Sequence, residues 1–170
     1  MKRLLAVLAL LACTSAHASD FTDHVKITEP PVTMPPMVFV DEEGIQHTLA
    51  EYHGRFVLLN IWASWCAPCV KEMPALDQLQ MKTNLKHLAV LPLSEDRDPD
   101  TVMAFYGSHG IHHLPVAVDR TGLAPSVLNL SGIPTTILIN PQGIEVARVQ
   151  GDADWASIEA GEFINEMSRL

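Results

Sequence analysis

The chain has 170 residues and a formal net charge of −9, with 11 Lys and Arg against 20 Asp and Glu. This length fits a single domain of ordinary size. The acidic balance argues against nucleic acid and anionic lipid as partners, because a negatively charged surface is repelled by both.

Residues 1–18 have the pattern of a secretory signal peptide. Two basic residues precede a nine-residue apolar run, residues 4–12, and residues 16–18 are an Ala-x-Ala cleavage site. A membrane-spanning helix needs about 20 apolar residues, so we expect cleavage after this site and export to the periplasm. A second interpretation stays open, because residues 10–13 resemble a bacterial lipobox that would lipidate Cys13 and anchor the protein.

Cleavage would leave a mature chain that begins at Ser19. Nine Lys and Arg then remain against twenty Asp and Glu, a formal charge of −11. Residues 19–36 are polar and rich in proline, so we expect an extended lead-in or tether. Residues 37–170 are expected to form one folded domain, because the chain contains no internal repeat and no sign of a second domain.

The domain is predicted to begin with a β-hairpin whose strands are residues 37–40 and 45–49. The apolar run 55–62 predicts a buried strand. A helix follows over residues 67–81, and Pro74 should kink it, because proline removes a backbone hydrogen bond from a helix interior.

A second strand and helix follow this helix. Residues 87–93 predict a strand, and the next helix should run from Pro99, with Asp98 as its N-cap, to a stop at Gly110. The remaining predicted elements are a strand at 114–118, a short helix at 123–130, strands at 135–139 and 145–149 joined by a turn, and a last helix at 155–170 that Asp154 caps. Trp155 and Ile158 are among the apolar residues expected to pack this helix on the sheet. The alternation of strands and helices predicts an α/β fold with a mixed central sheet.

Cys66 and Cys69 flank an Ala-Pro pair directly after the predicted buried strand. A cysteine at the start of a helix faces unpaired backbone N–H groups and the positive end of the helix dipole, and both favour the reactive thiolate. Cys66 is therefore the expected nucleophile and Cys69 the resolving thiol. A single close thiol pair in an exported chain is typical of a redox catalyst rather than of a disulfide-stapled scaffold.

Zinc is the alternative use of two close cysteines. Such a site needs two further Cys or His ligands, usually at paired spacing. His112 and His113 are adjacent, and in a strand they would point to opposite faces. We therefore expect no metal and no cofactor.

Four stretches of the chain together resemble the TlpA-like exported thiol–disulfide oxidoreductases of the thioredoxin superfamily, a group whose relatives include ResA and CcmG. They are residues 59–69, 71–76, 132–136 and 140–143, and the match extends over about residues 37–170. The resemblance implies a thioredoxin-like fold: a central mixed β-sheet flanked by helices, with an N-terminal β-hairpin and a central helical insertion.

The same resemblance implies roles for individual residues. Cys66 would attack a substrate disulfide, and Cys69 would resolve the mixed disulfide. Pro134 would be a cis-proline beside the thiols, and with Ile133 and Pro68 it would form part of the substrate-binding surface. An ordinary trans turn is the alternative for Pro134.

Two further residues have competing interpretations. Trp65 is expected to dock substrates, with a core position as the alternative. Glu72 matches a carboxylate that assists proton transfer in ResA-like enzymes, although it could also be a solvated helix residue. Thioredoxins of the cytoplasm carry a buried Asp where this chain has Asn60, and an amide cannot titrate. The acidic run 94–98 is expected to be a solvated loop.

The expected function is that of a periplasmic protein-disulfide reductase. Its partners would be substrate proteins with disulfides and a membrane-bound electron donor, and the protein itself is expected to be a monomer. Plausible substrates are thiols that must be reduced before metal or haem insertion, as in cytochrome c maturation or copper-centre assembly.

Two other functions stay open. A thiol peroxidase on a related fold would need a single peroxidatic Cys with a nearby Thr and Arg, and the Trp-rich CxxC pattern does not fit it. A Sco-like copper-delivery protein would need a longer Cys-x-x-x-Cys loop and a distant His, whereas two residues separate Cys66 from Cys69.

Overall fold

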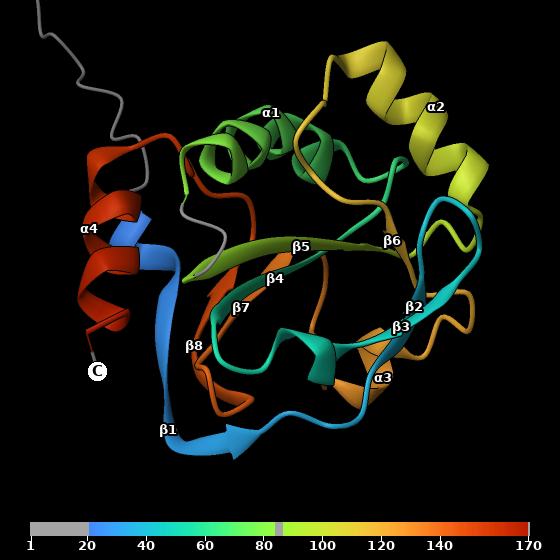
Figure 1. Ribbon diagram of the computed structural model, residues 1–170. Coiled ribbons are helices and arrows are strands. Elements are labelled where there is room, and N and C mark those ends of the chain that lie inside the picture. Colours follow the sequence, from blue (N-terminus) through green and yellow to red (C-terminus); the bar gives the residue numbers. More distant parts are fainter. Residues whose placement is uncertain (1–20, 84–86, 170) are drawn as a thin grey trace, which may run out of the picture.

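A computed structural model of the protein describes residues 21–83 and 87–169. In this part of the chain, eight strands form one mixed sheet in the order β1-β8-β7-β4-β5-β6-β2-β3, with helices on both faces (Figure 1). The predicted α/β class is confirmed. The expected signal peptide, with Cys13, lies outside the described residues.

The strands are β1 (Val25–Thr33), β2 (Val38–Val40), β3 (Gln46–Thr48), β4 (Phe56–Trp62), β5 (Leu88–Ser94), β6 (Ala117–Val118), β7 (Thr135–Ile139) and β8 (Ile144–Gln150). The α-helices are α1 (Ala67–Lys82), α2 (Pro99–His109), α3 (Ala124–Val127) and α4 (Ile158–Met167), and the 3-10 helices are η1 (Phe21–His24) and η2 (Leu49–Tyr52). Helix α1 runs through Pro74.

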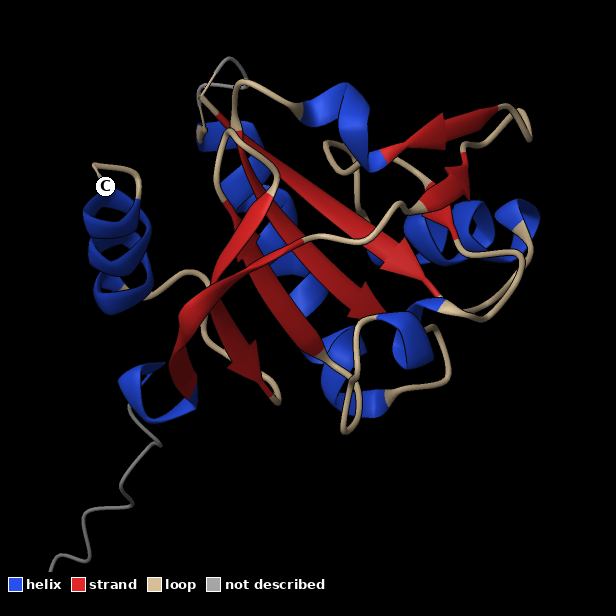
Figure 2. Cartoon of the chain, turned by 90° about the horizontal axis from the view of Figure 1, so that it is seen from below, coloured by secondary structure: helices blue, strands red, loops and turns tan. Residues whose placement is uncertain are grey.

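Strand β4 lies in the middle of the sheet. It pairs in parallel with β5 along its whole length and antiparallel with β7 on its other side. The hairpins β2–β3 and β7–β8 supply antiparallel pairs toward either edge, and β2–β3 is the predicted N-terminal hairpin. Figure 2 shows the twist of this sheet from below.

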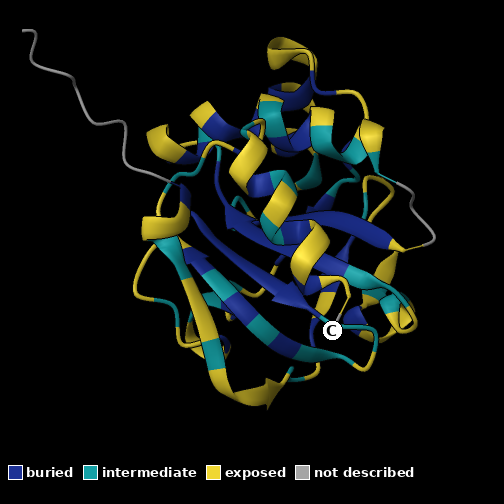
Figure 3. Cartoon of the chain, turned by 90° about the vertical axis from the view of Figure 1, so that its left-hand side faces the viewer, coloured by how far each residue is buried: buried dark blue, intermediate teal, exposed yellow. Residues whose placement is uncertain are grey.

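The sheet separates two apolar cores. Helices α1, α2 and α4 cover one face, where Met73, Phe105 and Ile164 pack against the sheet. Helix α3 and η2 cover the other face. Central strands buried on both faces have near-continuous apolar sequences, and Figure 3 shows them as the most buried part of the molecule. The polar exception in β4 is Asn60, which is fully buried on the α1 side.

The segment expected to be an extended lead-in is extended, but from Val25 it is a strand of the sheet. Strand β1 pairs antiparallel with β8, and its register shifts between Ile27 and Val32. Most of its residues are exposed, as Figure 3 shows. Preceding it, Phe21 is buried against Trp155, with ring centroids 5.3 Å apart.

Two elements are shorter than predicted. The strand expected at 114–118 is only β6, because the backbone N–H of Leu114 donates to Asp77 on α1 instead of to a neighbouring strand. The helix expected at 123–130 is only α3, and it is followed by Asn129 in the left-handed region, with φ of 50°. A residue in that region cannot continue a right-handed helix.

The last helix begins later than predicted. Its N-cap is Ser157, whose hydroxyl accepts a hydrogen bond from the Ala160 N–H at 3.1 Å, so the expectation that Asp154 caps it is wrong. Trp155 therefore precedes the helix and enters the core, whereas Ile158 is 76% exposed and does not pack on the sheet.

One buried carboxylate fixes the connection between α2 and β6. Asp77 Oδ1 accepts hydrogen bonds from the backbone N–H groups of His112, His113 and Leu114, at 3.0, 2.6 and 3.1 Å. Its Oδ2 lies 2.9 Å from Nδ1 of His113. Burial alone would raise the pKa of Asp77, but these hydrogen bonds outweigh it and hold the pKa below its usual range.

We predict that Asp77→Ala lowers the free energy of unfolding by about 2 to 3 kcal/mol, because three backbone donors lose their acceptor. Urea denaturation at neutral pH measures the loss. Because the pKa of Asp77 is lowered on folding, its contribution is present above the unfolded-state pKa and disappears as the pH falls through the folded-state pKa. Gln78→Ala, at the exposed next position of α1, is the matched control. Equal stabilities of the two variants would contradict the prediction.

Candidate active site around Cys66 and Cys69

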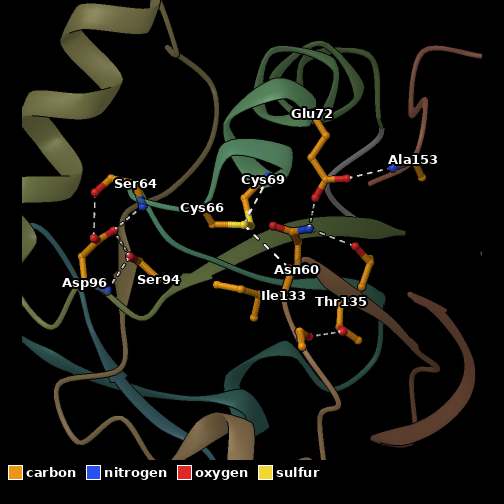
Figure 4. The surroundings of a disulfide bond; sticks show 12 residues. Asn60, Ser64, Cys66, Cys69, Glu72, Ser94, Asp96, Ile133, Thr135 and Ala153 are labelled. Atoms are coloured by element: carbon orange, nitrogen blue, oxygen red, sulfur yellow. Dashed lines mark hydrogen bonds between the residues drawn. A yellow bond between two sulfur atoms is a disulfide. The ribbon is translucent and has the colours of Figure 1, made fainter. Parts of the chain in front are cut away.

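The two expected catalytic cysteines lie where β4 passes into α1. They form a disulfide with their Cα atoms 5.2 Å apart (Figure 4). Cys66 is the N-cap of α1, and the Cys69 N–H points at its Sγ at 3.4 Å. Cys66 is 6% exposed and Cys69 is fully buried. The sulfur that an incoming group can reach is therefore that of Cys66, which fits the expected nucleophile.

The start of the helix favours a thiolate on Cys66. Unpaired N–H groups and the helix dipole stabilise negative charge at this position. Pro68 occupies the first turn, where a missing N–H removes no helical hydrogen bond. Its ring is exposed, between the two cysteines of the disulfide.

A second loop approaches the disulfide from the start of β7. The Ile133–Pro134 peptide bond is cis, which is the geometry expected from the sequence. The carbonyl oxygen of Ile133 lies 3.7 Å from Cys66 Sγ. Hydrogen bonds from the Thr135 hydroxyl to the Gly132 carbonyl, at 2.7 Å, and from the Gly151 N–H to the Pro134 carbonyl, at 3.0 Å, hold this loop in place.

The two tryptophans of the motif have opposite environments. Trp62 is fully buried, with ring centroids 5.0 Å from Phe105 and 6.0 Å from Tyr106. Trp65 is 70% exposed, so the alternative that places it in the core is wrong. An exposed indole next to the nucleophile is available to a docking partner, because large exposed aromatic groups anchor interfaces.

Glu72 lies on α1, three residues after Cys69. Its side chain is only 3% exposed, so it is not a solvated helix residue. Its Oε1 accepts a hydrogen bond from Asn60 Nδ2 at 2.7 Å. Its Oε2 accepts from the Ala153 N–H at 3.2 Å and from Trp155 Nε1 at 3.1 Å. Burial raises the pKa of Glu72 to about 7, and these three donors oppose that rise.

Asn60 connects the carboxylate to the surroundings of the disulfide. Its Nδ2 donates to Glu72 and also to Thr136 Oγ1, at 2.9 Å. Figure 4 shows the amide between the disulfide and the Glu72 carboxylate. Cytoplasmic thioredoxins have a titratable Asp at the position of Asn60. Here Asn60 is neutral, and the titratable group is its hydrogen-bond partner Glu72 on α1.

The acidic run 94–98 is only partly the solvated loop that was expected. Asp96 is half-buried and accepts hydrogen bonds from the Ser64 N–H at 2.9 Å and the Ser64 hydroxyl at 2.7 Å. The hydroxyl of Ser94, which is buried, donates to the same carboxylate at 2.7 Å. These bonds fasten the segment before Trp65 to the end of β5.

Sequence reasoning missed the donors that surround Glu72. Ala153 and Trp155 are separated from it by 81 and 83 positions in the chain, and no local pattern predicts such contacts. Among the described residues, no group of three or more His, Cys, Asp or Glu side chains is arranged to hold a metal ion.

Comparison with known proteins identifies the family. Residues 28–161 match the family described as Redoxin. The chain belongs to the redoxin family. The thiol-disulfide oxidoreductase ResA of Bacillus thuringiensis subsp. konkukian (strain 97-27) is 30% identical over 134 residues, which cover 79% of this chain and 76% of the relative. ResA of Geobacillus thermodenitrificans (strain NG80-2) is 31% identical over 140 residues, which cover 82% and 79%.

Solved structures agree with this assignment. A crystal structure from Chlorobium tepidum, assigned as a thiol:disulfide interchange protein DsbE, is 26% identical, with a TM-score of 0.71 over 81% of this chain and 96% of that one. The thioredoxin-like fold expected from the sequence is confirmed. As a redoxin with a CxxC pair, the protein is a thiol–disulfide oxidoreductase, and proteins with disulfides are its substrates.

The site predicts that Glu72 and the thiols titrate together. An ionised carboxylate near a thiolate raises the thiol pKa, so Glu72→Gln should lower the pKa of the Cys66 thiol and remove the titration step that Glu72 contributes near neutral pH. The fold should persist, because Gln is a comparable helix former. The pH dependence of Cys66 alkylation by iodoacetamide measures the change.

The control is Glu162→Gln, which changes an exposed carboxylate on α4. It should leave the alkylation profile unchanged. If the Glu72→Gln and parent profiles coincide, Glu72 does not interact with the thiols.

Proposed function

We propose that the protein is an exported, periplasmic protein-disulfide reductase that keeps metal-site or haem-site cysteines of other proteins reduced. The observation that carries the proposal is the asymmetry of the thiol pair, with Cys66 at the helix N-terminus beside an exposed Trp65 and Cys69 fully buried behind it. The resemblance to the TlpA-like group supports the reducing direction and a membrane-bound electron donor.

The reaction has two exchange steps. The Cys66 thiolate attacks one sulfur of a substrate disulfide, so that the substrate S–S bond breaks, a mixed disulfide forms and one substrate thiolate leaves. The Cys69 thiolate then attacks Cys66 Sγ, which forms the Cys66–Cys69 disulfide and releases the second substrate thiolate. Two electrons pass from the enzyme to the substrate, and a dithiol donor returns them.

Four residues are proposed to hold the substrate at the sulfur. Trp65 and Pro68 are exposed beside Cys66, and Ile133 and Pro134 place a carbonyl 3.7 Å from its Sγ. A substrate cysteine that attacks or leaves at Cys66 must pass between these two segments. The Ser64–Asp96 hydrogen bonds fix one of them, and the Thr135–Gly132 hydrogen bond fixes the other.

Glu72 is proposed to accept the proton of Cys69. The second exchange step needs Cys69 as a thiolate, and the thiol is buried away from water. A group whose pKa is about 7 can take and release a proton at neutral pH. Glu72 is such a group, and it lies on the same helix as both cysteines.

We predict that Cys66→Ser abolishes insulin reduction, because no thiol remains at the accessible position. Cys69→Ser should instead accumulate covalent complexes with substrates, because the mixed disulfide can no longer be resolved. Turbidity of reduced insulin measures the first effect, and non-reducing gels with mass spectrometry of periplasmic extracts measure the second.

Gln78→Ala, at an exposed position of the same helix, is the control and should retain activity. Insulin reduction by Cys66→Ser at the parent rate would overturn the catalytic assignment. If Cys69→Ser traps no protein whose cysteines bind metal or haem, the proposed substrate class is wrong, although the exchange chemistry stands.

Export is proposed from the pattern of residues 1–18. No helix in the described residues is long and apolar enough to cross a membrane. We predict that protein from the periplasmic fraction has an intact mass that corresponds to an N-terminus at Ser19. A lipid-modified Cys13 would support the anchored form instead, and an uncleaved cytoplasmic chain would contradict both.

A further inference from the structure

Asn60 has one polar atom without a partner in the described part of the chain. The side chain is fully buried, and its Nδ2 donates to Glu72 and Thr136. Its Oδ1 is also buried but has no hydrogen-bond donor. An unsatisfied buried acceptor is unfavourable, and buried polar groups in folded proteins are nearly always paired. Asn60 Oδ1 is thus an acceptor that a donor in another state of the protein could satisfy.

The orientation of the amide follows from its neighbours. When Glu72 is ionised it only accepts hydrogen bonds, and the NH₂ group of Asn60 then faces it, as the 2.7 Å contact shows. The carbonyl then has to point to the other side of the amide. Figure 4 shows that this side is the one that faces the disulfide. A flipped amide would place its oxygen against the carboxylate oxygens.

In the disulfide state the sulfur atoms carry no hydrogen and cannot satisfy this oxygen. Reduction breaks the S–S bond and adds two electrons and two protons, which a dithiol donor supplies as it becomes a disulfide. The new Cys66 thiol has the Ile133 carbonyl 3.7 Å from its sulfur. The new Cys69 thiol is fully buried in the core that α1 covers, where solvent cannot accept its hydrogen.

We propose that Asn60 Oδ1 accepts a hydrogen bond from the Cys69 thiol in the reduced enzyme, which makes Asn60 a positioning residue that favours the dithiol state. The inference deepens the proposed function and rests on its exchange of electrons through Cys66 and Cys69. It does not rest on proton transfer by Glu72. The hydrogen bond exists only after reduction, so it shifts the equilibrium toward the dithiol and makes the reduction potential less negative.

The test compares Asn60→Leu with the parent in glutathione redox buffers. Leucine removes the acceptor, so the dithiol loses a hydrogen bond and the disulfide loses an orphaned oxygen. Both changes favour the disulfide. Together we expect them to shift the dithiol–disulfide equilibrium constant by about tenfold, which makes the reduction potential of the Cys66–Cys69 pair about 30 mV more negative. Thr136→Val is the matched control, because it removes the other partner of the same amide and leaves Oδ1 untouched. An unchanged potential for Asn60→Leu would overturn the proposal.

The same comparison in a Glu72→Leu background separates this proposal from the role of Glu72. Leucine removes the carboxylate, and Thr136 Oγ1 still accepts a hydrogen bond from Asn60 Nδ2, so the amide keeps its orientation. If Oδ1 accepts from Cys69, the Asn60→Leu shift persists in this background. If Asn60 acts only through the Glu72 carboxylate, the shift disappears and the proposal fails, while Glu72 remains a candidate proton acceptor.

A second measurement uses the chain without any substitution at Asn60, in case Asn60→Leu does not fold. Asparagine labelled with ¹³C at the side-chain carbonyl gives separate infrared bands in reduced-minus-oxidised difference spectra. A new hydrogen bond lowers the stretching frequency of one asparagine carbonyl on reduction. A difference spectrum without such a band would contradict the proposal.

Discussion

The Glu72 carboxylate is buried one helical turn after Cys69, and three donors from two separate segments meet on it. Asn60 comes from the central strand, whereas Ala153 and Trp155 come from the connection between β8 and α4. This arrangement holds the catalytic helix to the sheet and to the C-terminal part of the chain. It also costs folding free energy, because the pKa of Glu72 is raised from 4.5 to about 7. The free energy of unfolding therefore falls by up to about 3 kcal/mol as the pH rises from 4.5 to about 7, because the unfolded chain releases this proton at lower pH than the folded chain does.

The rest of the fold compensates for that polar site with apolar packing. Trp155 donates to Glu72 on one side and packs on Phe21 on the other, at 5.3 Å. The ring of Phe163 lies 5.7 Å from that of Phe21. The segment before β1 and the C-terminal helix thus close the core over the carboxylate. A buried titratable group needs such cover, since its shifted pKa depends on the exclusion of water.

The sequence predicts the parts of this structure that depend on local signals. The CxxC pair, the Asp98 and Gly110 caps of α2 and the hairpin β2–β3 all follow from neighbouring residues. The sequence does not predict what depends on distant contacts. The short β6 results from Asp77, 37 positions before Leu114, and the burial of Glu72 results from donors up to 83 positions away. Asn60 could be singled out from the sequence, but its partners could not.

The two sulfurs of the pair thus face different chemistry. Cys66 faces the helix N-terminus, the surface and a backbone carbonyl, so it is built to exchange with another protein. Cys69 is buried in the interior. The amide of Asn60 lies between the disulfide and the carboxylate of Glu72. Negative charge on Glu72 opposes a second negative charge on the thiols, and loss of that charge removes the opposition. In the proposed mechanism, electrons are exchanged at Cys66 on the outer side, and protons are exchanged between Cys69 and Glu72 on the inner side, three positions apart on the same helix.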